Sequence, residues 1–541
     1  MSRSLTSLLP LVVVAAACSL EGLADGSGAG GLGGAAASSS SSSGGSDGVG
    51  GVGGAGGAPT SAFTWLATIG NELVQGTSPY ATDAGSGSTL RMSVPGPSGE
   101  VWVAVATKGA LDPDGAGPLP SRGSTDSANL FVLEIAPGGA VTAFGALEGD
   151  LESIEEPLSV GAVVRVAGDA VAVVGTFRAG TLDLGAIGQL TNTSQSQDDG
   201  FVVRFDAAAV PTHARQLGGG NVQTARAATV HEGALLVAGK LKRVLAVTDP
   251  DGVADAACAF SQNMEEFERV LVAALDPADL KCTHRVLFAA TDVNAAQQAW
   301  AIAADASGVY VAGSYTRQLI ADPLPSMPAS ASEDGFIVAL DPDLTPATTR
   351  WVARATSNRN SGVDALRAAA LSGGRLWVGG YLDRGTTAVM SAEPSIETLD
   401  AVADNDCILT LPDVRDGLVG ALDPQDGTCL GAALLGTAQG DEVRGLAPSP
   451  GGVVATGFTT AGVMELDASL AGGSRDGFAA FLSIGTGAEI DGGWVLGGVS
   501  WDYLDAAQVT GSEVVLAGTF DASFDFLTGG ADFWIGSRPV P

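Results

Sequence analysis

Two segments decide how this chain folds: VYVAGSY at 309–315 and DGFIVALDP at 334–342. Both are rich in β-branched, aromatic and other apolar residues and are bounded by Gly, Asp or Pro, which is typical of β-strands joined by turns. Gly313 is the fifth residue of the first segment. Variants of the two segments return, in the same order, along most of the chain.

The glycine-containing strand has six other copies: VAVATKG (103–109), VAVVGTF (171–177), LLVAGKL (235–241), LWVGGYL (376–382), GVVATGF (452–458) and VVLAGTF (514–520). The fifth residues of the seven copies are Thr107, Gly175, Gly239, Gly313, Gly380, Thr456 and Gly518. Neighbouring copies are 62 to 76 residues apart at that position. A long, nearly constant period is the signature of a repeat architecture.

Two further strands complete each repeat. One follows a short turn and reads, for example, TTRWVARA at 348–355. The other is Ala-rich, as in QAWAIAAD at 298–305. Four short strands per repeat, seven repeats and no long segment with a helical period predict an all-β chain. We expect a single seven-bladed β-propeller of four-stranded blades.

The two ends of the chain test the number of blades. The last copy of the second strand, DFWIG at 532–536, is followed by no third strand. A surplus strand, FTWLATIG at 63–70, precedes the first complete repeat. We therefore predict that strand 63–70 completes the C-terminal blade. This pairing would close the ring and cover the sheet edges that an open ring exposes.

The repeat resembles the bacterial β-propeller repeat family known as SBBP. Members of that family carry a V-Y-V-x-G strand, then a D-x-F-V-x-x-x-D-P strand, then a short strand that often contains Trp. VYVAGSY and DGFIVALDP are the matching residues here, and the resemblance covers most of residues 63–536. The first, third and sixth copies depart from the pattern. The resemblance implies an extracytoplasmic propeller of a surface or secreted protein and no defined activity.

The N-terminus has the layout of an export signal. Arg3 precedes an apolar stretch, and the small residues at 15–17 precede Cys18. This order predicts a signal peptide over 1–17. A Cys directly after small residues resembles the bacterial lipobox, and by that resemblance Cys18 is diacylated and becomes the mature N-terminus. The alternative is an ordinary signal peptide followed by an unmodified Cys.

The segment that begins at Cys18 suits a tether. Residues 18–62 are mostly Gly, Ala and Ser, a composition that gives a flexible coil without core-forming side chains. We expect this lipidated tether to carry a propeller over 63–541. By resemblance to sorted lipoproteins, Ser19 directs the protein to the outer membrane, where it faces the periplasm or the cell surface.

Four cysteines remain after Cys18. Cys282 and Cys429 both open the third strand of a repeat, and Cys258 and Cys407 both lie in the long insert before the second strand. Equivalent placement in two repeats predicts the disulfides Cys258–Cys282 and Cys407–Cys429, which suit an oxidising compartment. Each insert must then run down the outer edge strand to reach its partner. Free thiols or a thiol metal site are the alternative, which the absence of C-x-x-C spacing disfavours.

The three histidines give little evidence of catalysis. His213 and His284 occupy the same position in adjacent repeats, which favours a role in the scaffold. His231 falls in an expected tight turn without metal-ligand spacing around it. The sequence contains no HExxH, G-x-S-x-G or P-loop motif, so we assign no catalytic, cofactor-binding or metal-binding residue.

Asp-rich segments suggest turns more than metal sites. DPDGAG (112–117) and DPDGVAD (249–255) resemble fragments of a calcium loop, so Ca²⁺ binding there is a minority interpretation. A recurrent Asp precedes the second strand at Asp199, Asp334, Asp416 and Asp476. We expect these carboxylates to turn the chain into the strand and to bond an adjacent blade.

The net charge and the loop lengths indicate which ligands to exclude and where a ligand would bind. Sixty acidic and 26 basic residues give a net charge of −34, which argues against electrostatic binding of nucleic acid or of an anionic membrane. The loops between the first two strands are long and variable, the longest at 383–415, and function tends to lie on such loops. We therefore place recognition on the long-loop face, around the centre of the propeller.

The functional interpretation that follows is a non-catalytic binding or scaffold lipoprotein of the bacterial envelope. Its expected partner is a protein or a glycan. An enzyme that acts on carbohydrate or peptide through acidic residues, and an envelope-assembly scaffold, are the alternatives, because carboxylate pairs need not be close in sequence.

Overall fold

The computed structural model describes residues 64–69, 90–108, 128–151, 158–192, 194, 197–219, 221–261, 267–288, 295–321, 327–344, 349–357, 362–383, 387–391, 407–410, 415–436, 440–460, 466–470, 475–484, 488–497, 502–520 and 532–540. All of them belong to one compact unit, Gly50–Pro541. The expected signal peptide, Cys18 and the tether lie outside the described residues. Within the described residues, no helix is both long enough and apolar enough to cross a membrane.

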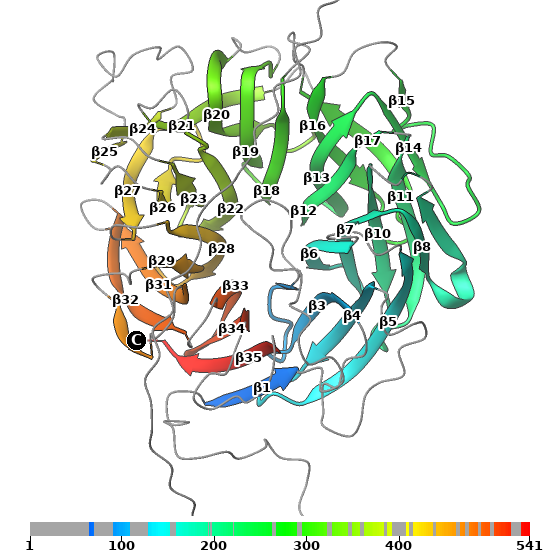
Figure 1. Cartoon of the computed structure of the whole chain (residues 1–541), viewed down its shortest axis with the longest axis horizontal. Helices are drawn as coiled ribbons and strands as arrows, with labels where there is room; N and C mark the ends of the chain where they lie inside the picture. Colours follow the sequence, from blue (N-terminus) through cyan, green and yellow to red (C-terminus); the bar gives the residue numbers. More distant parts are fainter. Residues whose placement is uncertain are drawn as a thin grey trace, which may run out of the picture. The chain divides into compact units, whose positions relative to one another are not determined.

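The strands of the described residues form seven sheets around one axis (Figure 1). Each sheet has a core of four antiparallel strands, which confirms the predicted seven-bladed β-propeller. The expected order within a blade is also found, with the Ala-rich strand innermost, then the glycine-containing strand, the second strand and the third strand. The only helix of this part of the chain is a short 3₁₀ turn, η2 (Gly185–Ile187).

The first four blades follow, each from the innermost strand outward. The first contains β2 (Leu90–Met92), β3 (Val101–Lys108), β4 (Ala128–Ile135) and β5 (Val141–Leu151). The second contains β6 (Leu158–Arg165), β7 (Val171–Arg178), β10 (Asp198–Phe205) and β11 (Pro211–Gly218). The third contains β12 (Gln223–His231), β13 (Ala234–Lys242), β16 (Glu268–Leu275) and β17 (Cys282–Leu287). The fourth contains β18 (Gln297–Asp305), β19 (Gly308–Leu319), β20 (Met327–Leu340) and β21 (Thr349–Ser357).

The last three blades keep the same order. The fifth contains β22 (Ala365–Ser372), β23 (Arg375–Leu382), β26 (Asp416–Leu422) and β27 (Cys429–Leu435). The sixth contains β28 (Glu442–Ser449), β29 (Gly452–Thr459), β31 (Asp476–Ile484) and β32 (Ala488–Leu496). The seventh contains β33 (Asp502–Thr510), β34 (Glu513–Phe520), β35 (Asp532–Pro539) and β1 (Trp65–Ile69).

The N-terminal strand closes the ring. β1 pairs with β35 in antiparallel register, from Trp65 opposite Ser537 to Ile69 opposite Phe533. The strand predicted over 63–70 is therefore confirmed, although its described length is five residues. Figure 1 shows the blue β1 beside the red β35, so the two ends of the chain share one sheet and no blade is left with three core strands.

Cross-strand register corrects two of the repeat copies. In every blade, the fifth-position residue pairs with the residue at one equivalent position of the next strand. In the fourth blade, for example, Gly313 lies opposite Phe336. By this criterion the sixth copy places Gly457, not Thr456, opposite Phe478. A run of apolar residues does not by itself show which residue takes the fifth position, so the alignment of this copy from sequence was wrong by one residue.

The sequence alignment of the first copy was wrong by two residues. Val105, not Thr107, lies opposite Phe131. The fifth position of the first blade is therefore occupied by Val105, the one described copy without a glycine. The strand predicted at 103–109 is found at Val101–Lys108.

The fifth-position glycines are required by a β-bulge in the innermost strand. A Cβ at Gly313 would overlap the carbonyl oxygen of Gln298 and lie 2.7 Å from the ring of Phe336. The register of β18 against β19 shifts directly after this point, which marks the bulge. In the first blade, Val105 takes the place of the glycine and β2 pairs without a shift. A bulge needs close backbone approach, which a glycine opposite it permits.

The long inserts add strands to the outer edge of the preceding blade. β8 (Gly180–Asp183) and β9 (Gln189–Asn192) extend the first blade, β14 (Val244–Thr248) and β15 (Phe260–Ser261) the second, and β24 (Thr387–Ser391) and β25 (Cys407–Thr410) the fourth. In the sixth blade, β30 (Asp467–Leu470) pairs in parallel with β32 of the same blade. Three of these inserts therefore leave one blade and pair with its neighbour, which the sequence analysis did not anticipate, whereas β30 stays with its own blade.

The two predicted disulfides are present. Cys258 bonds Cys282, with Cα atoms 5.9 Å apart, and Cys407 bonds Cys429, with Cα atoms 5.8 Å apart. Each bond joins an insert on the outer edge of one blade to the outermost strand of the next. The disulfides therefore staple the second blade to the third and the fourth to the fifth.

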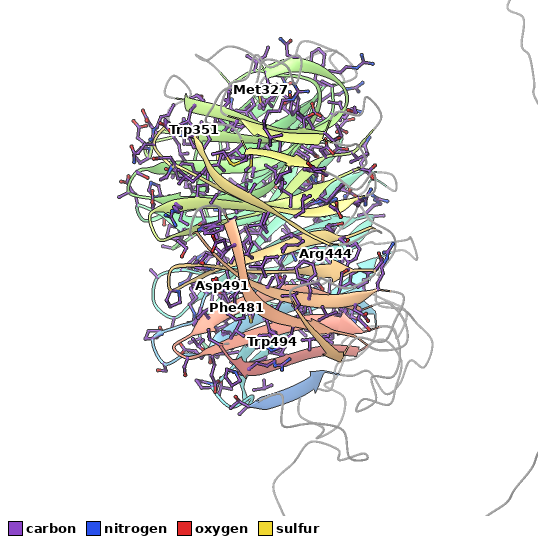
Figure 2. The ribbon with its side chains drawn as sticks, turned by 90° about the vertical axis from the view of Figure 1, so that its left-hand side faces the viewer. Met327, Trp351, Arg444, Phe481, Asp491 and Trp494 are labelled. Atoms are coloured by element: carbon purple, nitrogen blue, oxygen red, sulfur yellow. A yellow bond between two sulfur atoms is a disulfide. The ribbon has the colours of Figure 1, made fainter. Side chains whose placement is uncertain are left out.

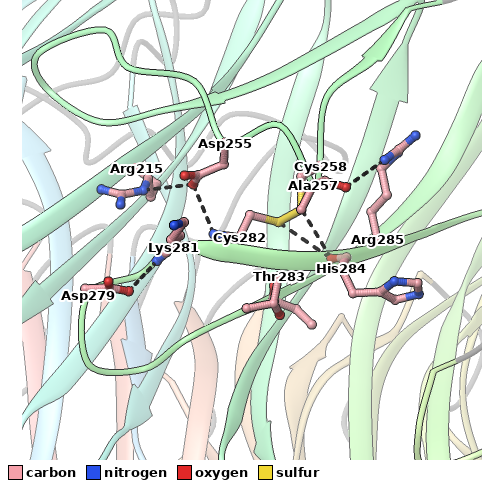
Figure 3. Close-up of a disulfide and its surroundings, with 11 residues drawn as sticks. Arg215, Asp255, Ala257, Cys258, Asp279, Lys281, Cys282, Thr283, His284 and Arg285 are labelled. Carbon is pink, nitrogen blue, oxygen red and sulfur yellow. Dashed lines mark hydrogen bonds and ion pairs between the residues drawn. A yellow bond between two sulfur atoms is a disulfide. The ribbon is translucent and has the colours of Figure 1, made fainter.

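Asp255 reinforces the first staple (Figure 3). Its Oδ2 accepts a hydrogen bond from Arg215 Nε at 3.1 Å, on the outermost strand of the second blade. The same oxygen accepts the backbone N–H of Cys282 at 3.0 Å, at the start of β17. One buried carboxylate thus ties two blades together beside the disulfide.

The core lies between the blades. Apolar side chains of adjacent sheets interdigitate in clusters, one of which joins the third and fourth blades. Figure 2 shows the ring edge-on and labels Phe481 and Trp494 of the sixth blade. Their ring centroids are 5.5 Å apart with the planes nearly perpendicular. Because each face is buried by a neighbouring blade, the ring is held rigid around its axis.

Candidate functional site

One position of the innermost strands points a varied set of side chains at the axis. In each blade, one residue of the innermost strand pairs with the fifth-position residue of the glycine-containing strand; the position meant here is the next residue along the innermost strand. In the seven blades it is occupied by Arg91, Gly161, Arg226, Trp300, Arg367, Arg444 and Asp505. We call this set the inner ring. In six blades the position is the bulged residue, and bulges re-aim side chains away from the sheet. The surrounding strand residues are mostly Ala, Leu and Val, so the large polar members stand out.

The inner ring lies near the end of the axis that carries the long loops. Each of the bulged residues is the third or fourth residue of its strand, as in β22 (Ala365–Ser372) and β18. The inner strands begin at the end where the glycine-containing strands finish and the long inserts depart. The long-loop end, predicted as the recognition face, is therefore also the end at which the inner ring lies.

Three members of the inner ring form a stack. The guanidinium carbon of Arg367 lies 3.8 Å from the centroid of the Trp300 ring, and that of Arg226 lies 5.3 Å from the same centroid. Trp300 is fixed in turn by its Nε1, which donates to Ser314 Oγ at 3.1 Å. Cation–π contacts of this kind attract each guanidinium to the indole and hold it in place.

The stack continues outward to the long-loop end. Arg367 lies 5.6 Å from the centroid of the buried Tyr381 ring, and Arg415 lies 4.4 Å from it. Arg415 also pairs with Asp383, at 3.6 Å between Nε and Oδ1. Arginine and aromatic side chains therefore alternate from Arg226 at the inner ring to Arg415 directly before β26.

A second stack lies one blade further on. Arg444 lies 4.3 Å from the centroid of Tyr503 and 5.1 Å from that of Phe458. Arg475 lies 5.0 Å from Phe458 and donates from Nη1 to Tyr503 Oη at 3.0 Å. Arg475 directly precedes β31 as Arg415 precedes β26, so both stacks reach the same end of the propeller.

Two carboxylates belong to the site. Asp505 Oδ1 lies 3.2 Å from Arg444 Nη1, and Glu442 Oε1 lies 3.7 Å from Arg444 Nε and 3.9 Å from Arg367 Nε. Burial by itself lowers the pKa of Arg444, but Glu442 and Asp505 outweigh it and raise that pKa above its ordinary value. Arg444 is therefore firmly held as a cation.

Arg91 has different surroundings. Its Nε donates to the carbonyl oxygen of Gly161 at 3.0 Å and its Nη1 to that of Leu90 at 3.3 Å. Burial lowers the pKa of Arg91 to about 10, and the charges of Arg444, Arg226 and Arg367 act in the same direction while Asp505 opposes them. Four arginines from four blades are thus close enough to repel one another.

The inner ring keeps contact with solvent. The side chains of Arg367 and Arg444 retain 14% and 20% of their accessible surface. Arg91, Arg226 and Trp300 are also half-buried. Each of these side chains is therefore ordered by its neighbours and retains part of its accessible surface.

The histidines are placed as scaffold residues. His213 and His284 lie at equivalent positions of β11 and β17, and a ring nitrogen of His284 lies 3.0 Å from the carbonyl oxygen of Leu344. His231 ends β12 directly before the turn, rather than within it, and is buried. None of the three belongs to the inner ring.

Two of the four recurrent carboxylates before the second strand, Asp199 and Asp334, bond their own blade, not the neighbouring one as expected. Asp334 accepts from Arg354 Nε and from Thr356 Oγ1, each at 3.0 Å, and both donors lie on β21 of the same blade. The bond between blades is made by Asp364, whose Oδ2 accepts the backbone N–H of Ser357 at 2.7 Å. Burial raises the pKa of Asp364 to about 7.

Of the two Asp-rich segments that resemble calcium loops, the structure describes one. The stretch at 112–117 lies outside the described residues. At 249–255, Asp249 Oδ1 accepts the backbone N–H groups of Asp251 and Val253 at 3.1 and 2.8 Å, and Asp255 pairs with Arg215. In the described ranges, no group of three or more His, Cys, Asp or Glu side chains is arranged to hold a metal ion.

Sequence reasoning placed recognition at this end but named none of the inner ring. A signal was available, because Trp300 is the largest residue of the Ala-rich strand at 298–305 and Arg444 is the largest residue of β28, the equivalent strand of the sixth blade. Aligning these strands at the glycine partner would have placed them at a single position.

Comparison with known proteins adds little beyond the fold. No protein-family model matches the chain, and no curated protein matches it. Among solved structures it is similar to a quinohemoprotein alcohol dehydrogenase from Comamonas testosteroni (9% identity, TM-score 0.34, covering 88% of this chain and 77% of that one). It is also similar to the WD40 domain of Pan2 from Neurospora crassa (10%, 0.30, 71% and 90%) and to the hemagglutinin-neuraminidase ectodomain of parainfluenza virus 5 (9%, 0.31, 87% and 85%). Likeness at this level carries no argument about function.

Proposed function

We propose that this protein is a non-catalytic binding or scaffold lipoprotein of the bacterial envelope, and that it takes its ligand at the long-loop end of the propeller axis. The observation that carries the proposal is the inner ring, in which arginines and a tryptophan from separate blades converge and remain half-buried. Binding sites are built in this way, with a rigid scaffold that holds a few polar groups at the point where loops converge.

The anchoring part of the proposal rests on the sequence around Cys18 and on the resemblance to SBBP propellers. The two disulfides agree with an oxidising compartment outside the cytoplasm. The composition between Cys18 and β1, mostly Gly, Ala and Ser, is that of a tether, which would let a lipidated propeller present its long-loop end away from the membrane.

Two experiments test the two parts. Cells expressing the full chain are labelled with radioactive palmitate, and we expect the label in wild type and its loss in Cys18→Ser; unlabelled wild-type protein would refute the anchor. Detergent-solubilised full-length protein is then applied to glycan and peptide arrays. We expect binding to a defined set of ligands, and an array without any reproducible signal would contradict the binding role.

A further inference from the structure

The inner ring is positively charged within a strongly acidic protein. Among the residues that the structure describes, two carboxylates, Asp505 and Glu442, form ion pairs with its arginines, whereas the whole chain has a net charge of −34. Both carboxylates lie against Arg444, and the distance from Glu442 to Arg367 is 3.9 Å. A local surplus of cations is unexpected in such a chain unless something anionic compensates it.

Arg91 shows the surplus most directly. Among the residues that the structure describes, its guanidinium donates only to backbone carbonyl oxygens, those of Gly161 and Leu90. Burial is the main cause of its lowered pKa; Asp505 opposes the shift, and the charges of the three other arginines add to it by repelling its positive charge. An anion near the axis would relieve this repulsion for all four arginines together.

The arginines are also held in position before any ligand arrives. Trp300 lies between Arg226 and Arg367, and its own orientation is fixed by Ser314. A guanidinium stacked on an aromatic ring retains its N–H donors for hydrogen bonds in its own plane. Such an arrangement reduces the entropy that binding would otherwise cost.

We propose that the inner ring binds one carboxylate group of a small ligand, which reaches it from the long-loop end. This inference rests on the proposed function and names the chemistry of its ligand. A carboxylate is planar and accepts paired N–H donors from a guanidinium. A single negative charge suits the ring better than phosphate does, because the added charge and oxygens of phosphate would be repelled by Asp505 and Glu442.

The test is calorimetry on the detergent-solubilised full-length protein at constant ionic strength. The probes are glucuronate, N-acetylglycine, glucose and inorganic phosphate. We expect at least one of the two carboxylates to bind and glucose to give no heat. The tighter of the two carboxylates identifies the source as a sugar acid or as the end of a peptide.

Variants locate the binding. Arg367→Gln and Arg226→Gln each remove a charged donor of the inner ring, and each should weaken carboxylate binding by about ten-fold or more, since a hydrogen bond to a charged group has that worth. Arg375→Gln is the matched control, because Arg375 starts β23 at the opposite, short-turn end. It should bind like wild type.

Three results would overturn the inference. These are phosphate binding as tight as that of the carboxylates, wild-type affinity in both inner-ring variants, or no stabilisation of the wild-type protein against heat by either glucuronate or N-acetylglycine relative to chloride. The last measurement needs no variant and keeps the test decisive if a substitution prevents folding. Array ligands without a carboxylate that both variants still bind would refute the inference and leave the proposed binding role intact.

Discussion

Replacing Asp416 by Asn should stabilise the protein at alkaline pH, although it removes a buried carboxylate of the repeat. Asp416 and Asp334 occupy the same position of neighbouring blades. Asp334 has Arg354 and Thr356 as hydrogen-bond donors. In the register of the next blade Leu434 takes the place of Arg354, and within the described residues Asp416 Oδ1 has no hydrogen-bond partner.

The magnitude follows from the pKa of Asp416. Burial, with a further contribution from the charge of Asp441, raises it from the ordinary 3.8 to about 7. The folded protein therefore keeps a proton that the unfolded chain releases, so this stability is present below about pH 4 and is lost as the pH rises through 7. Roughly three pKa units at 1.36 kcal/mol each set an upper bound of ~4 kcal/mol. Screening by water at the end of the blade reduces this to about 2 kcal/mol.

Urea unfolding at pH 5 and pH 8 measures the effect. Asp416→Asn should raise the free energy of unfolding by about 2 kcal/mol at pH 8 and by roughly 0.8 kcal/mol at pH 5, where the unfolded chain has already released most of this proton. Asp334→Asn is the matched control and should lower it by about 3 kcal/mol at both pH values, because it leaves Arg354 buried without its partner. The reasoning fails if Asp416→Asn destabilises the protein at pH 8 or leaves its pH dependence unchanged.

Two other predictions concern the scaffold. The double variant Cys258→Ser/Cys282→Ser should lose about 3 kcal/mol of unfolding free energy, because the bond closes a loop across 24 residues; urea unfolding equal to that of the oxidised wild type would contradict this. Gly313→Val should cost about 1–3 kcal/mol, because the new side chain would meet Gln298 and Phe336 opposite the bulge. It should also shift the tryptophan emission, since the bulge aims Trp300, and an unchanged spectrum with unchanged stability would show that the glycine is dispensable.

The sequence predicted features that depend on counting. The number of blades, the closure of the ring by the strand at 63–70 and the two disulfide pairs all follow from how often an element recurs and where one is missing. These inferences survive errors of a residue or two. The residue that takes the fifth position was predicted wrongly in the copies at Gly457 and Val105, because a run of apolar residues looks alike in every register.

The location of the inserts could not be predicted for a different reason. An insert such as β14–β15 is bounded by ordinary turn residues, and nothing local specifies which strand edge it will meet. Its partner is β11 of the preceding blade, some thirty residues earlier in the chain. Only the assembled ring brings that edge within reach, so the pairing is a property of the tertiary structure.

The inner ring depends both on the repeated sequence and on the assembled tertiary structure. In six of the seven blades a glycine makes room for the bulge, and the bulge in turn directs one side chain to the axis. The side chain at that position differs from blade to blade, from Gly161 to Trp300. The scaffold therefore fixes where a ligand would be contacted and leaves its chemistry to be set by single residues. In this chain that choice has placed four arginines at one point of a strongly acidic protein, which is the strongest physical argument for an anionic ligand.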